Sequence, residues 1–316
     1  VVVAHSGWGS GTFARAVWPG CRYVPYVEWY YRHPPLDRVL SEAKRTDEDG
    51  RAYALARNAP TLLDLAEADL VFCPTRFQAA QFPAHLRRGM RVMHDGVDTR
   101  MHAPDPAATP PAAAGALPQG AEIVSYATRG MEPHRGFPEF MRALERLQRR
   151  RPRLHAVIGG ENRVSYGPKP AGGRGWKEIM LEELDLDERR ISWTGLLPRG
   201  DYVRLLQSTH VHVYLTVPFV LSWSLIEAMS VGAPLVLSDT EPVREAATHE
   251  VEAELVDHRD PEALADAIER MLDDRDRAGR MGRAARARVL RDYDAAWIWP
   301  WRRRVLEDLV RYGPPG

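Results

Sequence analysis

Two series of alternating segments constrain the fold of this 316-residue chain. Short runs rich in β-branched residues alternate with longer segments of helical period, which is typical of parallel α/β units. A helix rich in alanine and leucine is expected at Arg51–Ala68, within the first series. The strands predicted for the first series are Val1–Ala4, Tyr23–Val27, Leu70–Cys73 and Arg91–Met93.

The stretch PDPAATPPAAAGALPQG, residues 104–120, interrupts this alternation. Prolines and small residues without a period are typical of a linker. We therefore predict an N-terminal Rossmann-like domain over residues 1–103, a linker over 104–120 and a C-terminal Rossmann-like domain over 121–292. A last helical segment is expected over 293–316.

The alternation restarts after the linker, and six strands with interleaved helices predict a second doubly wound sheet. The fold class is therefore α/β. The expected strands are Glu122–Ala127, Leu154–Ile158, Ile191–Trp193, His212–Leu215, Leu235–Ser238 and Ala253–Val256. The expected helices are Gly136–Arg150, Gly175–Leu184, Arg199–Ser208, Ser222–Val231, Pro242–Ala247, Pro261–Leu272, Asp274–Asp292 and Ala295–Val310, the last kinked by Pro300.

Composition excludes several classes of protein. Hydrophobic content of 44% with 27% charged residues is normal for a globular domain, and 43 basic residues balance 43 acidic ones, so no global field favours nucleic acid. Two cysteines are too few for a disulfide framework, which favours a reducing compartment. No run approaches the roughly 18 apolar residues of a spanning helix, and the chain does not start with a signal peptide. We expect a cytoplasmic protein that does not bind nucleic acid.

Polar residues gather where the predicted strands end. Ligands of open α/β sheets bind at the carboxyl ends of the strands, so these residues mark a candidate site. Each residue alone also has a simpler explanation, because strands end in loops and loops are polar. The set comprises His5 with Gly9 in the following GWGSG, Glu28, Thr75, His94–Gly96, Arg129, Gly159–Glu161, Thr194–Gly195 and Thr216.

Arg129 and Arg135 bracket a tight loop, RGMEPHRG, between a strand and a helix expected to begin near Gly136. Helix N-termini carry unpaired N–H groups and a positive partial charge, so anions collect there. Two guanidinium groups beside such an end suit a diphosphate. The alternative is a pair of solvated arginines.

Glu227 lies among apolar residues in PFVLSWSLIEAMSVGAPLVLSD, residues 218–239. A carboxylate in such company costs free energy unless it is paired or turned to solvent. Ser222 is a plausible N-cap, and Ser224 and Glu227 share nearly one face of the helix that follows. Glu227 either accepts the hydroxyls of a ribose or is an exposed glutamate stabilised by the helix dipole.

Several motifs, which follow one another along the chain in the order and at the spacing of the family, resemble the retaining glycosyltransferases of the GT-B fold, family four (glycosyltransferase group 1). SWSLIEAMSVGAPLVLSDTEPVREA resembles the signature helix and strand of that family. YATRGMEPHRGFPEFMRAL is similar to its diphosphate loop, and VIGGEN to the glycine turn that follows. ISWTGLLPRGDYVRLLQSTHVHVYLT is similar to the segment around the nucleotide base, and MHDGVDT to the turn before the interdomain linker.

The resemblance implies two Rossmann-like domains facing a cleft, with the last helix, over 293–316, crossing back to the first domain. It also implies a nucleoside-diphosphate sugar as donor, UDP-sugar favoured, and no cofactor or metal. Glu227 would bind the ribose, and Arg129 and Arg135 would stabilise the departing diphosphate. His5 and Glu28 would face the acceptor: a carbohydrate, a lipid-linked sugar or a small molecule. The other residues expected to bind the donor are Ser222, Ser224, Gly160, Glu161, Gly195, Leu196 and Gly9.

Two departures leave alternatives open. Phe219 stands where the family often has a second glutamate, eight positions before Glu227, and the family carries further βα units before a VVVAHSGWG-like strand. The first domain is therefore expected to be incomplete, and a non-catalytic nucleotide-binding or scaffold protein remains an alternative. The chain has no pyridoxal-phosphate lysine signature of a phosphorylase and no GxGxxG signature of a dehydrogenase. WIWPWRRR, residues 297–304, leaves peripheral membrane contact open, and a homodimer is equally open.

Overall fold

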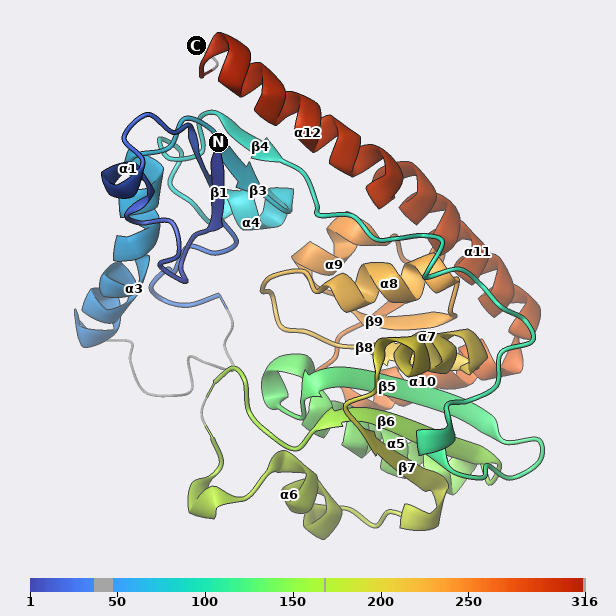
Figure 1. The fold of residues 1–316 in the computed structure, drawn as a ribbon. Helices are drawn as coiled ribbons and strands as arrows, with labels where there is room; N and C mark the ends of the chain where they lie inside the picture. Colours follow the sequence, from blue (N-terminus) through green and yellow to red (C-terminus); the bar gives the residue numbers. More distant parts are fainter. Residues whose placement is uncertain (37–47, 168, 315–316) are drawn as a thin grey trace. The chain divides into compact units, whose positions relative to one another are not determined.

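The structure, a computed structural model, describes residues 1–36, 48–167 and 169–314. The chain forms two compact units. The first unit comprises Val1–Gly96, Pro218–Leu221 and Tyr293–Gly316, and the second comprises Val97–Val217 and Ser222–Asp292. Figure 1 shows the elements of both units.

The first unit has, among its described residues, a parallel sheet of four strands in the order β1-β2-β3-β4. All four predicted strands of the first series are confirmed. The strands are β1 (Val2–His5), β2 (Tyr23–Tyr26), β3 (Val71–Cys73) and β4 (Met90–Val92); the helices are α1 (Ala14–Val17), α3 (Glu48–Ala66), α4 (Arg76–Ala80) and α12 (Ala295–Tyr312). The short helices α1 and α4 were not predicted.

Helix α12 covers one face of this sheet. Successive strand residues point to opposite faces, so Phe72 packs toward α12 while its neighbour Cys73 packs on the opposite side. Leu309 and Trp301 are the α12 side chains in the cluster with Phe72. Pro300 lies inside α12, which runs through it as one helix. Residues 315–316 of the predicted last segment lie outside the described residues.

The second unit contains a parallel sheet in the order β10-β9-β8-β5-β6-β7. Counted from β5, this is strand order 6-5-4-1-2-3, the doubly wound arrangement predicted from the sequence, and the order reverses between β5 and β8. All six predicted strands are confirmed: β5 (Glu122–Gly130), β6 (Leu154–Glu161), β7 (Ile191–Gly195), β8 (Val211–Tyr214), β9 (Leu235–Ser238) and β10 (Glu254–Val256).

The helices of the second unit cover both faces of its sheet. Helices α5 and α10 pack side by side on one face, and α7 and α8 lie on the other, as Figure 1 shows. Val124 faces the cluster that contains α5 and α10, whereas its neighbour Ile123 packs against Leu205 of α7. The helices are α5 (Phe137–Arg150), α6 (Trp176–Glu183), α7 (Arg199–Ser208), α8 (Trp223–Val231), α9 (Glu241–Ala246), α10 (Pro261–Asp273) and α11 (Arg275–Asp292).

The predicted linker belongs to the second unit, and part of it packs on the sheet. Ala112–Ala114 form a 3-10 turn, and Ala114 is buried with Ile123 and Leu205. The carbonyl oxygen of Ala114 accepts a hydrogen bond of 2.6 Å from the Ser192 hydroxyl of β7. This stretch therefore covers the sheet surface, and its small residues fit close to the strands.

The contact between α8 and α11 depends on glycine. A Cβ atom at Gly282 of α11 would collide with the carbonyl oxygen of Gly232, the left-handed residue that ends α8. A Cβ at Gly279, on the same helix, would meet only the flexible end of Arg283, at 3.4 Å. Glu227 lies on α8, so this close approach fixes the helix that carries it.

We expect Gly282→Ala to lower the free energy of unfolding by about 1–3 kcal/mol, because overpacking outweighs the better helix propensity of alanine. Gly279→Ala is the matched control and should raise stability by up to about 1 kcal/mol. Urea unfolding of the two variants measures both effects. Equal changes in the two variants would contradict the close contact.

Candidate functional site

The loop between β5 and α5 places Arg135 at the point where the strand order reverses. The guanidinium donates a 3.0 Å hydrogen bond from Nη1 to the Thr216 hydroxyl, which lies just after β8. It also lies 5.6 Å from the centre of the Tyr166 ring. Gly136 follows with φ 64° and is the N-cap of α5; a Cβ there would press on Leu215. Glycine therefore allows the tight turn that presents Arg135 and the first turn of α5 together.

Arg129 lies near the carboxyl end of β5 and is exposed. The structure shows no hydrogen bond or ion pair from its guanidinium to another described residue. Arg129 is thus a solvent-facing cation, while Arg135 is half-buried and held by Thr216. Both arginines belong to the same strand–loop–helix segment.

Glu132 and the loop after β6 complete this region. The buried Glu132 carboxylate accepts hydrogen bonds from the backbone N–H groups of Ser165 and Tyr166, at 2.6 and 2.7 Å. Burial raises the pKa of Glu132. These bonds hold Tyr166 beside Arg135. Glu132 was not predicted from the sequence as part of the site, although its position in RGMEPHRG, between the two arginines, indicated that it could be.

The glycine turn after β6 brings that strand close to the end of β5. Gly160 has φ 133°, and a Cβ atom there would collide with the carbonyl oxygen of Thr128. Glu161 pairs with Arg163 at the surface, with Nε and Oε2 2.5 Å apart. Gly195 at the end of β7 has φ 65° and open space where a Cβ would lie, and Leu196 beside it is exposed. The strand ends therefore leave an accessible surface.

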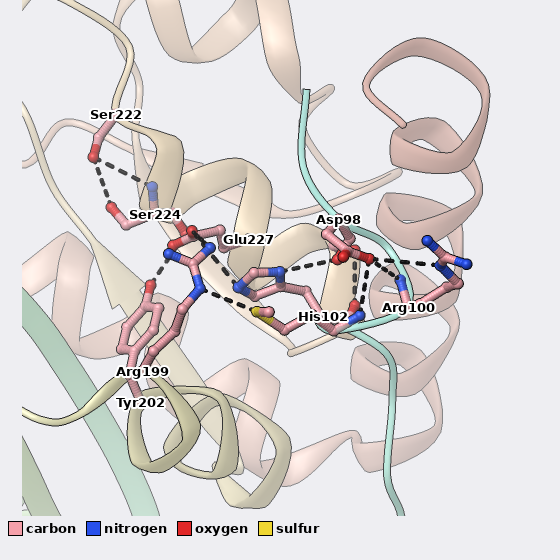
Figure 2. Close-up of polar contacts among 10 residues, drawn as sticks. Asp98, Arg100, His102, Arg199, Tyr202, Ser222, Ser224 and Glu227 are labelled. Carbon is pink, nitrogen blue, oxygen red and sulfur yellow. Dashed lines mark hydrogen bonds and ion pairs between the residues drawn. The ribbon is translucent and has the colours of Figure 1, made fainter. Parts of the chain in front are cut away.

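The N-terminus of α8 is capped as the sequence predicts. The Ser222 hydroxyl accepts from the backbone N–H of Ser224 at 3.3 Å, and the two hydroxyls lie 2.8 Å apart (Figure 2). The Ser222 N–H donates to the Tyr214 hydroxyl of β8 at 3.3 Å. This bond fixes the start of α8 against the strand next to β5.

Glu227 is neither solvated nor unpaired. Its side chain is 12% exposed, and its Oε1 accepts a 3.0 Å hydrogen bond from Nη2 of Arg199, the first residue of α7. The same oxygen lies 3.6 Å from Nε2 of His102 (Figure 2). The interpretation of Glu227 as an exposed glutamate is wrong, because the chain itself supplies two cationic or protonatable partners.

Neither His102 nor Arg199 was predicted from the sequence as a partner of Glu227. His102 follows the turn HDGVDT, whose Asp98 carboxylate accepts from the N–H groups of Arg100 and Met101, at 3.0 and 3.1 Å. Arg199 also donates from Nε to the Met101 sulfur at 3.1 Å. A histidine in a turn and an arginine at a helix start are unremarkable in sequence, so only the fold brings them together.

In the first unit, His5 and Glu28 meet where β1 and β2 end. Nε2 of His5 lies 3.0 Å from Oε2 of Glu28. The hydrogen bond to Glu28 raises the pKa of His5 above its ordinary value of 6.5, although burial acts in the opposite direction. Gly9 lies in the exposed loop that follows, with φ 73°.

A second polar cluster lies beside this pair. The Asp95 carboxylate accepts from the Tyr26 hydroxyl and from Nη1 of Arg302 on α12, both at 2.8 Å. Trp299 of α12 donates to the Asp95 carbonyl oxygen at 3.1 Å. Residues of the predicted last helix thus hold the loop after β4.

The predicted site residues are divided between the two units. Arg129, Arg135, Gly160, Gly195, Ser222, Ser224 and Glu227 belong to strand ends and helix starts of the second unit, whereas His5, Gly9 and Glu28 belong to the first. Within the described residues, no group of three His, Cys, Asp or Glu side chains could hold a metal ion. In that same part of the chain, every helix is too short or too polar to cross a membrane.

Two family models match the chain. Residues 1–102 match "Glycosyl transferase family 4 group", and residues 113–288, more than half of the chain, match "Glycosyl transferases group 1". The protein therefore belongs to the glycosyl transferases group 1 family and is a glycosyltransferase with the two parallel α/β sheets of the GT-B fold. The family and the fold that the sequence resembles are confirmed.

Solved structures support the same fold. Sucrose-phosphate synthase from Thermosynechococcus elongatus is 20% identical with a TM-score of 0.72, covering 98% of this chain and 73% of that one. Anabaena HepE in complex with UDP-glucose is 18% identical with a TM-score of 0.68, covering 95% and 75%. A glycosyltransferase from Rickettsia africae is 15% identical with a TM-score of 0.67, covering 95% and 80%. The comparison with curated proteins gives no match.

We expect Glu28→Gln to lower the pKa of His5, because burial then acts without its main opposing contact. Stabilisation by the pair should be present below pH 6.5 and lost as the pH rises through the raised pKa of His5. Because both side chains are partly exposed, its size should stay below about 1 kcal/mol. NMR titration of His5, with Glu67→Gln as a control, measures the change. An unaltered pKa of His5 in Glu28→Gln would contradict the pairing.

Proposed function

We propose that this glycosyltransferase moves a hexosyl group from a UDP-sugar to an acceptor hydroxyl, with retention of anomeric configuration and without a metal. The observation that carries the proposal is the arrangement around Glu227. The paired and nearly buried Glu227 carboxylate lies in the second turn of α8. The N-terminus of α8 is hydrogen-bonded to β8, next to the point where the strand order reverses. In doubly wound sheets, nucleotides bind at such a point.

Glu227 is the group proposed to bind the ribose. Both protein partners contact Oε1, and Oε2 accepts no hydrogen bond from a described residue in the structure. A carboxylate oxygen accepts hydroxyl donors, so Oε2 is suited to the ribose hydroxyls. Ser222 and Ser224, with the first N–H groups of α8, supply further polar contacts at this end of the helix.

Arg129 and Arg135 are proposed to bind the diphosphate. Arg135 is oriented by Thr216, Arg129 is exposed, and the first turn of α5 follows them directly. Negative charge grows on the diphosphate as the bond from the sugar to its oxygen breaks. The Arg135 guanidinium is already held by Thr216 and can stabilise that charge with little reorganisation, which is the usual role of fixed donors in catalysis.

The choice of UDP rests on the solved structures. Three of the similar structures are of HepE, in complex with UDP-glucose, with UDP, and with UDP and glucose. Gly195 and Leu196 leave backbone and apolar surface accessible beside the end of β7. Such a surface suits a nucleoside that is bound largely through backbone groups.

His5 and Glu28 are proposed to face the acceptor. The pair keeps an imidazole and a carboxylate in contact at strand ends of the first unit, and both side chains retain access to solvent. A histidine in contact with a carboxylate can accept the proton that an acceptor hydroxyl loses. The acceptor is therefore expected to carry a hydroxyl group.

A non-catalytic nucleotide-binding protein is the second candidate function. Its support is Phe219, which occupies the position where the family resemblance implies a second glutamate. The Phe219 ring packs on Trp29, with 4.7 Å between ring centres. Incubation with UDP-glucose, with and without acceptors, separates the two functions. A non-catalytic protein binds the donor and leaves it intact.

We expect UDP to raise the melting temperature by about 5–10 °C at one hundred times its Kd, since a ligand stabilises the folded state by mass action. GDP, ADP and TDP should give smaller shifts. Glu227→Ala and Arg129→Ala should abolish the UDP shift, while Glu241→Ala, an exposed glutamate at the start of α9, should keep it. If both site variants keep the full shift, the assignment of the donor site is wrong.

We expect Arg135→Gln to lower kcat by about 10²–10³-fold, because one fixed donor to the leaving group is lost. The KM for UDP-glucose should change much less. Arg142→Gln, which removes an exposed arginine of α5 paired with Glu183, is the matched control. Product NMR should show the anomer of the donor. An inverted product would overturn retention, and an unchanged kcat would overturn the role of Arg135.

A further inference from the structure

His102 carries a buried ring nitrogen aimed at Glu227. The side chain is fully buried, and Nε2 has no hydrogen-bond partner within normal distance among the described residues. It lies 3.6 Å from Oε1 of Glu227 (Figure 2). A buried polar atom without a hydrogen bond costs free energy, so this orientation requires a compensating interaction.

The other ring nitrogen fixes part of the protonation state. Nδ1 of His102 lies 3.0 Å from the carbonyl oxygen of Asp98. A carbonyl oxygen only accepts, so Nδ1 carries a hydrogen. In a neutral ring, Nε2 would then direct a lone pair at a carboxylate that also binds Arg199. A hydrogen on Nε2 as well removes this repulsion and gives the buried imidazolium a counter-charge in Glu227.

The backbone of His102 is held firmly. Its carbonyl oxygen accepts from the Ser230 hydroxyl of α8 at 2.8 Å and from Nη1 of Arg286 on α11 at 3.1 Å. Arg286 also donates to the carbonyl oxygens of Ser230 and Thr99. The ring is therefore tied to the helix that bears Glu227.

The charged groups around the ring have distinct places. The Asp98 carboxylate accepts from the N–H groups of Arg100 and Met101, and Arg286 donates to the carbonyl oxygens of His102 and Ser230. Arg199 contacts the same oxygen of Glu227 as His102 does. Glu227 is thus the carboxylate that faces Nε2.

We propose that His102 is a positioning residue that donates through both ring nitrogens, to Asp98 and to Glu227, and so fixes the Glu227 carboxylate for the donor ribose. The inference rests on the proposed role of Glu227 in binding the nucleotide. With His102 and Arg199 both on Oε1, the carboxylate keeps Oε2 directed to the ligand. Loss of the Nε2 proton would leave Arg199, an exposed side chain, as the remaining partner.

The protonation of His102 can be read without a ligand. In the whole protein labelled with ¹⁵N-histidine, the spectrum of a His102→Gln variant identifies the His102 signals by their loss. We expect both nitrogens of His102 to show the shifts of protonated nitrogens at pH 6.5. A bare Nε2 there would overturn the proposal, whether or not the protein binds UDP-glucose.

Two variants separate the two hydrogen bonds. The amide nitrogen of glutamine corresponds to Nε2, and that of asparagine corresponds to Nδ1. We expect His102→Asn to weaken binding of UDP-glucose about tenfold, as measured by calorimetry at pH 6.5. His102→Gln should stay within about threefold of the wild type. His155→Gln, a change at a buried histidine of β6 bonded to Ser192, is the control for general damage to the fold.

The outcomes also separate this inference from the proposed function. If Glu227→Ala abolishes binding of UDP-glucose but His102→Asn leaves it unchanged, the ribose role stands and the positioning role fails. If Glu227→Ala also leaves binding unchanged, the proposed donor site itself is wrong. Melting temperatures of both variants show whether a loss of binding reflects unfolding instead.

Discussion

The second unit is organised around a carboxylate that must not be left unpaired. Glu227 is 12% exposed, and its nearest cationic or protonatable partners are Arg199 from α7 and His102 from the turn after β4. A nearly buried charge without partners would cost several kcal/mol, so the partners are a condition of the fold as well as of the site. The turn after β4 and the start of α7 therefore both have to contact α8.

The doubly wound strand order makes this meeting possible. Because β5 and β8 are neighbours, the start of α5 and the start of α8 follow adjacent strand ends. Glycine is needed where the backbone is crowded: Gly136 turns the chain into α5, Gly160 passes the carbonyl of Thr128, and Gly282 lets α11 approach α8. Each glycine contributes to the position of an arginine or of Glu227.

Local signals in the sequence predicted much of this architecture. Period and composition predicted all ten strands to within a few residues. The identity of Ser222 predicted that it caps α8, and its hydroxyl accepts from the Ser224 N–H. These features depend on neighbouring residues. The pairing of Glu227 depends on residues 28 and 125 positions away, and no period links such positions. The same reason explains why the segment Pro218–Leu221 was not expected in the first unit.

The charges around Glu227 also resolve a conflict in the proposed site. A bare carboxylate near a diphosphate would repel it, by about 4 kcal/mol for unit charges 4 Å apart at an effective dielectric constant of about 20. The guanidinium of Arg199, 3.0 Å from Oε1, places positive charge beside the carboxylate and offsets that repulsion, and the proposed hydrogen on Nε2 of His102 would add to this effect. Glu227 can then act as a hydrogen-bond acceptor for the ribose, while Arg129 and Arg135 remain available to the phosphates. The proposed recognition of the ribose by Glu227 therefore depends on the partners that the protein supplies for its charge.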